Sequence, residues 1–301
     1  MHHGYYPHRS YKNHSAAQLD MIDRSLAFAY GDDEAFPDSV VDIGCGVGGS
    51  SRHITRKYGS IKKARGISLS PYQISRAHAF TQEQDLADVV EYKIDDAMAS
   101  SFADNEFDLT WSMESGEHMP DKKQFVKELV RVTSPGGRII VVTWCHRELK
   151  EDEDTLSARE MKLLQKINEA YFLPAWVPSS TYVALMREQN MEDIRSDDWS
   201  EYVMPFWPAV FKSALVPRNF FRMVRSGRTT IKGAWAGVCD QLSFYTNHSP
   251  NLFSVQFVSL YTIITIHNFV CLLGLWMLQG FATGTIKFAL ITGRKPKHEV
   301  F

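Results

Sequence analysis

Hydrophobic and polar positions alternate along residues 39–144 in a way that predicts a parallel sheet covered by helices. Polar stretches with apolar residues at helical spacing separate short apolar runs. The predicted strands are 39–44, 64–69, 89–95, 107–113 and 138–144. The predicted helices are 50–59, 70–84 and 121–133. Strands and helices that alternate at this spacing indicate an α/β fold with a mostly parallel sheet and helices on both faces.

The second half of the chain has a less regular pattern. An acidic run at 147–160 predicts a solvated loop that leads into a helix over 160–173. Residues 181–199 predict a helix followed by a strand, and 284–296 have the composition of a closing strand. Between these blocks, the aromatic-rich segment 203–228 has the composition of a cap.

Residues 241–286 contain no Asp, Glu, Lys or Arg, and 259–281 are apolar over a length that could cross a membrane. The polar residues Gln256, His267 and Asn268 within the uncharged run argue against a span. Three interpretations stay open: a membrane span, a cap helix packed on protein or on a membrane surface, and an insertion with no evolved role.

Charge and cysteine content exclude several classes of partner. The 301 residues carry 33 bases and 35 acids, so the formal charge of -2 gives no attraction to nucleic acid. The four cysteines are scattered and form no CxxC pair, which argues against structural zinc and a disulfide framework. We therefore expect no metal and no nucleic-acid partner, and a reducing compartment.

The strongest chemical signal is a glycine-rich loop after the first predicted strand. This strand contains Asp42, and Gly44, Gly46, Gly48 and Gly49 follow at the start of a predicted helix. Bare backbone at this place lets a ligand approach closely at the carboxyl edge of the sheet. The dinucleotide fingerprint fits only loosely, because here the acid precedes the glycines instead of following them by ~20 residues.

The string D-x-G-C-G-x-G at 42–48 resembles motif I of class I S-adenosylmethionine-dependent methyltransferases. Further stretches similar to that family follow in its order, at 66–77, 94–98, 107–114 and 132–141. The resemblance implies a Rossmann-like class I methyltransferase fold, with a mostly parallel seven-stranded sheet, helices on both faces and a helical cap. It also implies S-adenosyl-L-methionine as the cofactor.

The same resemblance implies which residues contact the cofactor. Asp42 faces the methionine end, Ser68 and Gln73 take the ribose role, and Asp96 accepts the adenine amino group beside the backbone of Ala97. A helix N-cap is the alternative role for Asp96. The full expected set is Val40, Val41, Asp42, Ile43, Gly44, Cys45, Gly46, Val47, Gly48, Gly49, Ser68, Gln73, Asp96, Ala97, Asp108, Trp111, Ser112 and Met113.

A narrower resemblance involves five segments spread over most of the chain. Residues 1–6, 111–122, 142–149, 197–215 and 286–296 are similar to the plant γ-tocopherol C-methyltransferase family, including its relatives that N-methylate monoterpene indole alkaloids. This resemblance implies C-methylation of a tocopherol-type chromanol and a plastid location. This chain shows no transit peptide, and a cytoplasmic location is the alternative.

The chain departs from this family in two ways. The family carries an additional N-terminal helix, so we expect an arm at 1–38 that is truncated and a chain that binds its cofactor weakly. Residues 237–275 have no counterpart in the family, and an unspliced intron read as protein would explain their lack of charge. The expected remaining parts are a cofactor-binding core at 39–150, and an acceptor cap with closing strands at 151–236 and 276–301.

Candidate catalytic residues follow the fourth predicted strand. Methylation of a carbon ortho to a phenol benefits from a general base near the chromanol. Glu114, Glu117 and His118 lie together in the sequence, and His118 is the preferred base because histidine titrates near neutrality. The alternative is that Glu117 and His118 only shape the cofactor pocket.

Aromatic residues in the second half suit an apolar acceptor pocket or, alternatively, plain core. They are Trp199, Phe206 and Trp207. Three functions stay open: C-methylation of a prenylated chromanol, N-methylation of an indole alkaloid or other amine, and an inactive or membrane-associated binding protein. The partner expected for the enzyme is a small lipophilic acceptor, with peripheral membrane contact possible and the oligomeric state undefined by the sequence.

Overall fold

The computed structural model describes residues 2–7, 13–31, 36–208 and 274–297. The chain divides into two compact units, Met1–Phe206 with Gln279–Phe301, and Trp207–Leu278. The helices and strands described below belong to the first unit. In chain order they are α1 His14–Tyr30, β1 Ser39–Ile43, α2 Gly49–Lys57, β2 Lys63–Ser68, α3 Pro71–Gln82, β3 Val90–Ile94, β4 Phe107–Met113, the 3-10 helix η1 Gly116–His118, α4 Lys122–Val132, β5 Thr133–His146, α5 Ala158–Tyr171, α6 Ser179–Glu188, β6 Glu192–Asp198, α7 Ser200–Val203 and β7 Ile286–Arg294.

The strands form one seven-stranded sheet with the order β3-β2-β1-β4-β5-β7-β6. The five strands from β3 to β5 are parallel, and β7 pairs antiparallel with both β5 and β6. The expected mostly parallel α/β fold is therefore confirmed. The strand order reverses direction between β1 and β4, and ligands of such sheets bind at the carboxyl ends of the strands beside this switch point.

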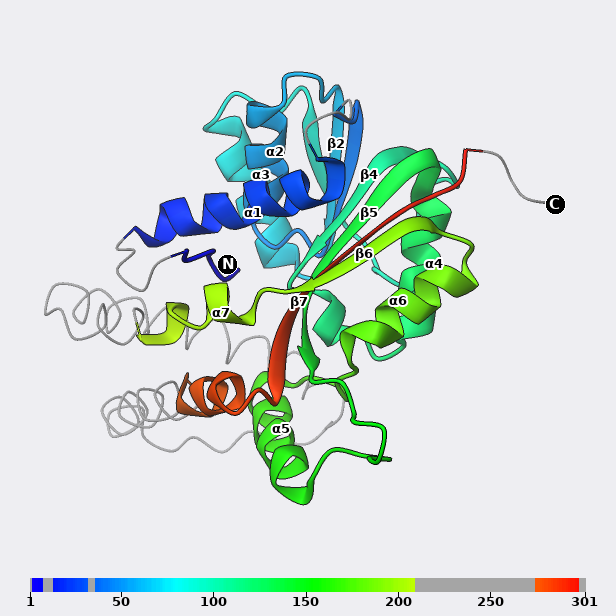
Figure 1. Ribbon diagram of the computed structural model, residues 1–301. Helices are drawn as coiled ribbons and strands as arrows, with labels where there is room; N and C mark the ends of the chain where they lie inside the picture. Colours follow the sequence, from blue (N-terminus) through cyan, green and yellow to red (C-terminus); the bar gives the residue numbers. More distant parts are fainter. Residues whose placement is uncertain (1, 8–12, 32–35, 209–273, 298–301) are drawn as a thin grey trace, which may run out of the picture. The chain divides into compact units, whose positions relative to one another are not determined.

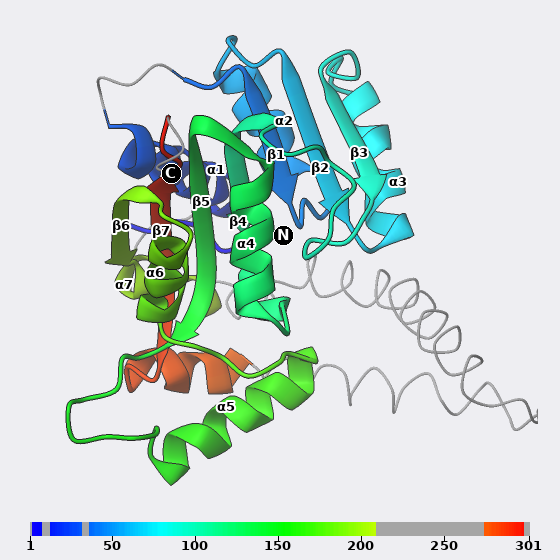
Figure 2. The same cartoon turned by 90° about the vertical axis from the view of Figure 1, so that its right-hand side faces the viewer.

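Helices cover both faces of the sheet, as Figures 1 and 2 show. The helices α1, α2 and α3 lie on one face, and α4 and α6 lie on the other. A buried cluster fills the space beneath α4 and α6, where Phe107 and Val141 of the sheet meet Phe125 and Tyr182 of the helices. This core fixes β4 and β5, whose carboxyl ends carry the candidate site.

One strand begins earlier than its sequence predicts. Residues 134–137, which separate the predicted helix 121–133 from the predicted strand 138–144, are part of β5, which begins at Thr133. The pairing register shifts there, because Phe107 pairs with Thr133 whereas Leu109 pairs with Arg138. A bulge absorbs the extra residues, and Gly136 has φ +81 within it.

Several expectations fall on residues that the structure does not describe. These are most of the cap expected at 203–228 and nearly all of the insertion expected at 237–275. Within the described ranges, no helix has the length and apolarity needed to cross a membrane. The expected domain boundaries stay predictions.

Candidate functional site

The glycine loop lies between β1 and α2, at the switch point of the sheet. Gly44, Gly46 and Gly48 have φ values of +84, +55 and +72, which are positions that favour glycine. A Cβ built on Gly46 or on Gly49 would meet no atom within 4 Å. These two glycines therefore present bare backbone to open space, as the close approach of a ligand requires.

Other glycines of this region are packed against side chains instead. A Cβ on Gly44 would lie 2.4 Å from the Cβ of Ser115, and the Ser115 hydroxyl donates to the carbonyl of Ile43 at 2.8 Å. A Cβ on Gly48 would lie 2.2 Å from the hydroxyl oxygen of Tyr92, which donates to the Gly48 carbonyl at 3.2 Å. The side chains of Ser115 and Tyr92 thus pack against the loop and fix its conformation.

A buried arginine also holds the glycine loop. Arg52 is 7% exposed, and its Nη1 donates to the carbonyl of Val47 at 2.7 Å. The loop residue Cys45 is buried as well, and burial raises the pKa of its thiol. A protonated thiol in this place is a packing group and not a nucleophile.

Asp42 lies near the carboxyl end of β1 and is almost completely buried. Its Oδ2 accepts a hydrogen bond from the Ser51 hydroxyl at 2.6 Å. Burial raises the pKa of Asp42 to about 6, although this hydrogen bond opposes the effect. A cationic group bound nearby would favour the ionised form of Asp42. The methionine end of the expected cofactor would supply such a group.

The residues expected to bind the ribose meet at the carboxyl end of β2. Ser68 ends the strand, and its hydroxyl donates to Oε1 of Gln73 at 2.7 Å. Ser70 caps α3 between them by accepting from the backbone N–H of Gln73. The Gln73 side chain is exposed, so the pair offers hydrogen-bonding groups to solvent at this edge.

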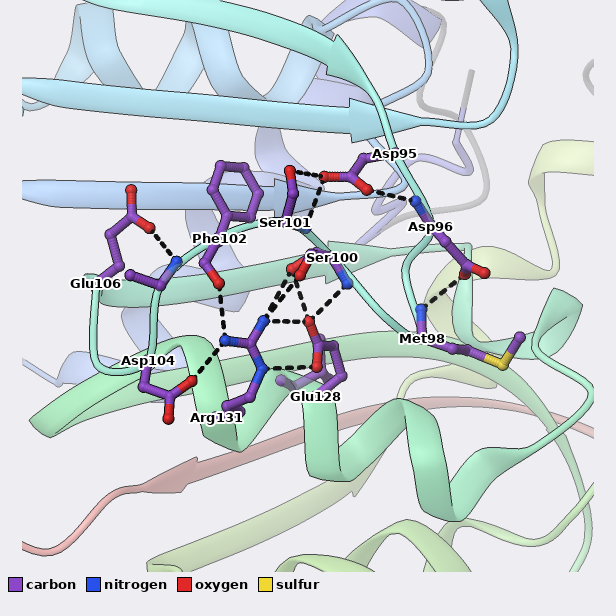
Figure 3. Close-up of polar contacts among 12 residues, drawn as sticks. Asp95, Asp96, Met98, Ser100, Ser101, Phe102, Asp104, Glu106, Glu128 and Arg131 are labelled. Atoms are coloured by element: carbon purple, nitrogen blue, oxygen red, sulfur yellow. Dashed lines mark hydrogen bonds and ion pairs between the residues drawn. The ribbon is translucent and has the colours of Figure 1, made fainter.

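Asp96 lies in the loop after β3, and this loop is bound tightly to α4 (Figure 3). Oδ1 of Asp96 accepts from the backbone N–H of Met98 at 2.9 Å within a turn. The alternative of a helix N-cap is therefore wrong, because no helix begins there. Ala97 beside it is 8% exposed and packs in the core.

Arg131 of α4 is the centre of the network that fixes this loop (Figure 3). Its Nη1 donates to the Phe102 carbonyl at 2.7 Å, and its Nη2 donates to the Ser100 carbonyl at 3.0 Å. Glu128 binds Arg131 and also accepts from the backbone N–H and the hydroxyl of Ser100. Two charged residues of one helix thereby set the position of the segment that carries Asp96.

Asp108 is not brought to the carboxyl edge with the other predicted residues. It lies at the start of β4, where Oδ2 accepts from the backbone N–H and hydroxyl of Ser39 at 3.0 and 2.8 Å. Ser39 begins β1, so this contact lies at the amino edge of the sheet. A cofactor bound at the glycine loop lies at the opposite edge, and we remove Asp108 from the candidate site.

The remaining predicted strand residues pack within the sheet. Val40, Val41, Ile43 and Trp111 are 0% exposed, and Met113 is 6% exposed. Ser112 is buried too, and its hydroxyl is hydrogen bonded to that of Ser115 at 2.6 Å. These residues place the loop and support it.

Glu114 follows β4 directly and has an unusual backbone, with φ +50. Its backbone N–H donates to the Val142 carbonyl of β5 at 2.7 Å. Both carboxylate oxygens accept from His3, Oε1 from the backbone N–H at 2.5 Å and Oε2 from Nδ1 at 2.8 Å. These interactions hold the pKa of Glu114 below its usual range despite burial.

Glu117 in η1 differs from Glu114 in its charge state. It is 3% exposed, and its Oε2 accepts from the hydroxyl of Thr143 at 2.8 Å. Burial, aided by the negative charge of Glu114, raises the pKa of Glu117 to about 8. Glu117 therefore carries a proton near neutral pH and is no general base there.

His118 ends η1 with an exposed side chain. Partial desolvation and the nearby Lys122 ammonium lower the pKa of His118, so its ring is neutral near pH 7. Lys122 itself donates to the carbonyls of Gly116 and Met119 at 2.8 and 2.7 Å, which fixes η1. Glu114, Glu117 and His118 thus lie together as expected, each in a different environment.

Two of the three expected acceptor-pocket aromatics lie in the first unit. Trp199 is 6% exposed, and Tyr5 packs edge-on against it at 5.2 Å between ring centroids. Phe206 packs on the ring of His3 at 4.4 Å. Trp207 belongs to the second compact unit.

Sequence reasoning missed the residues that support the site from a distance. Tyr92, Ser115 and His3 contact predicted site residues that are far away in the sequence. Arg131 binds the loop that carries Asp96. The only sequence signal at His3 is the resemblance of residues 1–6 to the family. Within the described ranges, no group of three His, Cys, Asp or Glu residues could hold a metal ion.

Comparisons with known proteins agree with this geometry. Residues 41–141 match the methyltransferase domain family. The chain is 45% identical to the probable tocopherol O-methyltransferase, chloroplastic, of Oryza sativa subsp. japonica, over 99% of this chain and 73% of the relative. It is 42% identical to the tocopherol O-methyltransferase, chloroplastic, of Arabidopsis thaliana, over 98% of this chain and 76% of the relative.

A more distant relative acts on a different class of acceptor. The norajmaline N-methyltransferase of Rauvolfia serpentina is 33% identical over 76% of each chain. Among solved structures, a geranyl diphosphate methyltransferase in complex with SAM aligns with a TM-score of 0.67. That alignment covers 98% of both chains at 16% identity, so it bears on the fold alone.

Proposed function

The chain belongs to the methyltransferase family of the tocopherol O-methyltransferases, and from this premise we propose that it methylates an aromatic carbon of a tocopherol-type chromanol. The single observation that carries the proposal is that a bare glycine loop lies at the same edge of the sheet as the Glu114 carboxylate, which His3 binds at both oxygens. The glycine loop suits a nucleoside cofactor. The Glu114 carboxylate suits an acceptor whose acidic hydroxyl group gives up its proton.

The proposed methyl donor is S-adenosyl-L-methionine, which supplies an electrophilic methyl group on a sulfonium. Gly44 to Gly49 would hold it with Asp42, and Ser68, Gln73, Asp96 and Ala97 would bind its nucleoside end. The open space at Gly46 and Gly49 supports this fit. The protein's main contribution is to align acceptor and donor without water, which can contribute ~7–11 kcal/mol.

We place the proton acceptor on Glu114 and not on His118, which the sequence favoured. The Glu114 side chain is 10% exposed and ionised, whereas His118 is exposed to solvent. The phenol O–H bond breaks and its proton passes to Glu114. The ortho carbon then forms its bond to the methyl group, whose bond to sulfur breaks; the ring proton leaves to solvent and Glu114 returns its proton to the oxygen.

The surroundings of this edge support a lipophilic acceptor. Trp144 of β5 lies 5.5 Å from His3 and 5.7 Å from Trp176, measured between ring centroids. Trp176 borders a cavity of about 610 Å³ that Leu149, Met161 and Leu164 also line. A prenylated ring is the acceptor class we propose. Its low solubility in water supports peripheral membrane contact, and the chloroplastic relatives support a plastid location.

Two acceptors offered in separate reactions test this proposal. The protein is incubated with methyl-labelled S-adenosylmethionine and either a γ-tocopherol-type chromanol or an indole alkaloid amine. We expect a mass gain of one methyl group on the chromanol. Transfer to the amine alone would favour the N-methylation that the Rauvolfia relative's name describes, and cofactor binding without any transfer would favour an inactive binding protein.

A further inference from the structure

Residues 2–6, called the arm below, pack against α1 and α7 within the first unit and reach the candidate active site. The backbone N–H of Tyr5 donates to the Ala17 carbonyl of α1 at 2.8 Å, and that of Tyr6 donates to the Tyr202 carbonyl of α7 at 2.9 Å. The rings of Tyr5 and Tyr202 are stacked, with centroids 4.4 Å apart. The arm is therefore anchored to two elements, and the position of His3 is well defined.

His3 and Glu114 form a buried two-point contact. Backbone and side chain of His3 each bind one carboxylate oxygen of Glu114, and the two side chains are only 5% and 10% exposed. The ring of His3 is surrounded by Trp144, Phe206 and Phe288, at 5.5, 4.4 and 5.8 Å between centroids. A contact at both oxygens fixes the rotation of the carboxylate as well as its place.

We propose that His3 is a positioning residue that holds the Glu114 carboxylate oriented and ionised for proton transfer. The role given to Glu114 rests on the proposed function, whereas its contact with His3 does not. Glu114 needs such a partner, because an isolated carboxylate in a buried place would take up a proton. The arm thus contributes a residue to the active site in addition to covering it.

The charged and titratable groups around Glu114 agree with this role. Burial lowers the pKa of His2 on the arm, so its ring is neutral near pH 7, and Glu117 and His118 lie near Glu114 on η1. Tyr171 of α5 has its pKa raised to about 12 by burial and by the charge of Glu114, so it remains a neutral phenol. Paired carboxyls whose environments separate their pKa values have different roles in proton transfer, here Glu114 as base and Glu117 as a neutral group.

The variants that test the proposal separate the hydrogen bond of His3 from the packing of its ring. His3→Phe keeps an aromatic ring in the cluster but removes the nitrogen, and His3→Asn keeps a donor near the position of Nδ1 without the ring. Tyr6→Phe is the matched control, because it removes the hydrogen bond to His14 at 2.8 Å in the same arm and leaves Glu114 untouched. Glu114→Gln identifies which carboxyl signal in the infrared spectrum belongs to Glu114.

The first readout is an infrared titration of the full chain without acceptor, with the Glu114→Gln spectrum subtracted. We expect the protonation midpoint of Glu114 to rise by about one pH unit or more in His3→Phe, less in His3→Asn, and not at all in Tyr6→Phe. An unchanged midpoint in His3→Phe would overturn the proposal. If His3→Phe does not fold, His3→Leu also lacks the nitrogen, and an unchanged midpoint in that variant overturns the proposal.

The second readout is the pH profile of turnover, measured with the acceptor that the wild-type protein methylates. In His3→Phe, kcat should fall at least about tenfold, because orientation is lost, and the loss should grow toward acidic pH. His3→Asn should recover most of kcat, and KM for S-adenosylmethionine should change little. Equal losses in His3→Phe and Tyr6→Phe would mean that the arm acts only by packing. If the wild type methylates no chromanol, the proposed function fails, and the infrared titration still decides the inference.

Discussion

Glycine has two different uses at the scale of single residues in the loop after β1. Gly44 has no room for a side chain because Ser115 fills the space, whereas Gly46 faces open space where a cofactor would lie. Both have positive φ, so both resist replacement by other residues. Only a replacement of Gly46 is therefore expected to change ligand binding directly.

Alanine at each position should therefore have a different effect. Gly46→Ala should cost ~1–2 kcal/mol of stability from its backbone conformation and weaken cofactor binding at least about tenfold. Gly44→Ala should lower stability further, because it adds a collision with Ser115 that costs ~1–3 kcal/mol. Thermal melts and calorimetric titration with S-adenosylhomocysteine check both, and unchanged affinity in Gly46→Ala would contradict the placement of the cofactor.

The raised pKa of Glu117 predicts a dependence of stability on pH. Folded Glu117 keeps its proton to about pH 8, whereas the unfolded residue loses it near pH 4.5. Between these values the folded state binds more protons, so the free energy of unfolding falls as pH rises, by at most about 1.4 kcal/mol per pH unit. Glu117→Gln should lack this slope.

Urea denaturation of both proteins between pH 5 and pH 8 measures the difference. The glutamine variant should gain stability relative to wild type as pH rises, because its side chain is neutral throughout and can still accept from Thr143. The contribution of Asp42, whose pKa is also raised, is common to both proteins and cancels. A pH-independent difference would show that Glu117 is ionised in the folded state.

At the scale of elements, α4 determines where the loop after β3 lies. Arg131 binds the carbonyls of Ser100 and Phe102, and its partner Glu128 has a side chain only 5% exposed. Removing the arginine leaves that carboxylate without its cation. The helix α4 thereby controls the segment expected to meet the adenine.

Arg131→Met should lower the free energy of unfolding by ~1–3 kcal/mol and raise KM for S-adenosylmethionine, with a smaller change in kcat. Lys123→Ala is the control on the same helix, because its pair with Glu188 is exposed and contributes little. Steady-state kinetics with both variants give the comparison. An Arg131→Met enzyme with wild-type KM would mean that this loop does not contact the cofactor.

Elements with strong periodicity could be predicted from the sequence, and the contacts between them could not. The order of strands and helices to residue 144 and the acid before the glycines follow from local pattern. Asp108 could have been excluded from the pattern alone, because it is the second residue of the predicted strand 107–113 and so belongs at the amino edge, where Ser39 binds it. His3 lies 111 residues from Glu114, and nothing local to either residue indicates their contact.

At the scale of the whole molecule, one edge of the sheet gathers every group that the proposed reaction needs. The glycine loop follows β1, Ser68 ends β2, Asp96 follows β3 and Glu114 follows β4. Parallel strands bring these positions together although the sequence separates them. The aromatic rings around His3 come from β5, β7 and the segment after α7, so the acceptor side depends on the second half of the chain.

The central claim is that this edge transfers a methyl group to an aromatic carbon, and the structure of the product tests it most directly. The protein is incubated with methyl-¹³C S-adenosylmethionine and a γ-tocopherol-type chromanol, and the product is examined by ¹³C NMR. We predict a labelled methyl on the ring, a free phenol, and no product from Glu114→Gln above background. A labelled methoxy group, or full activity in Glu114→Gln, would contradict the proposed chemistry.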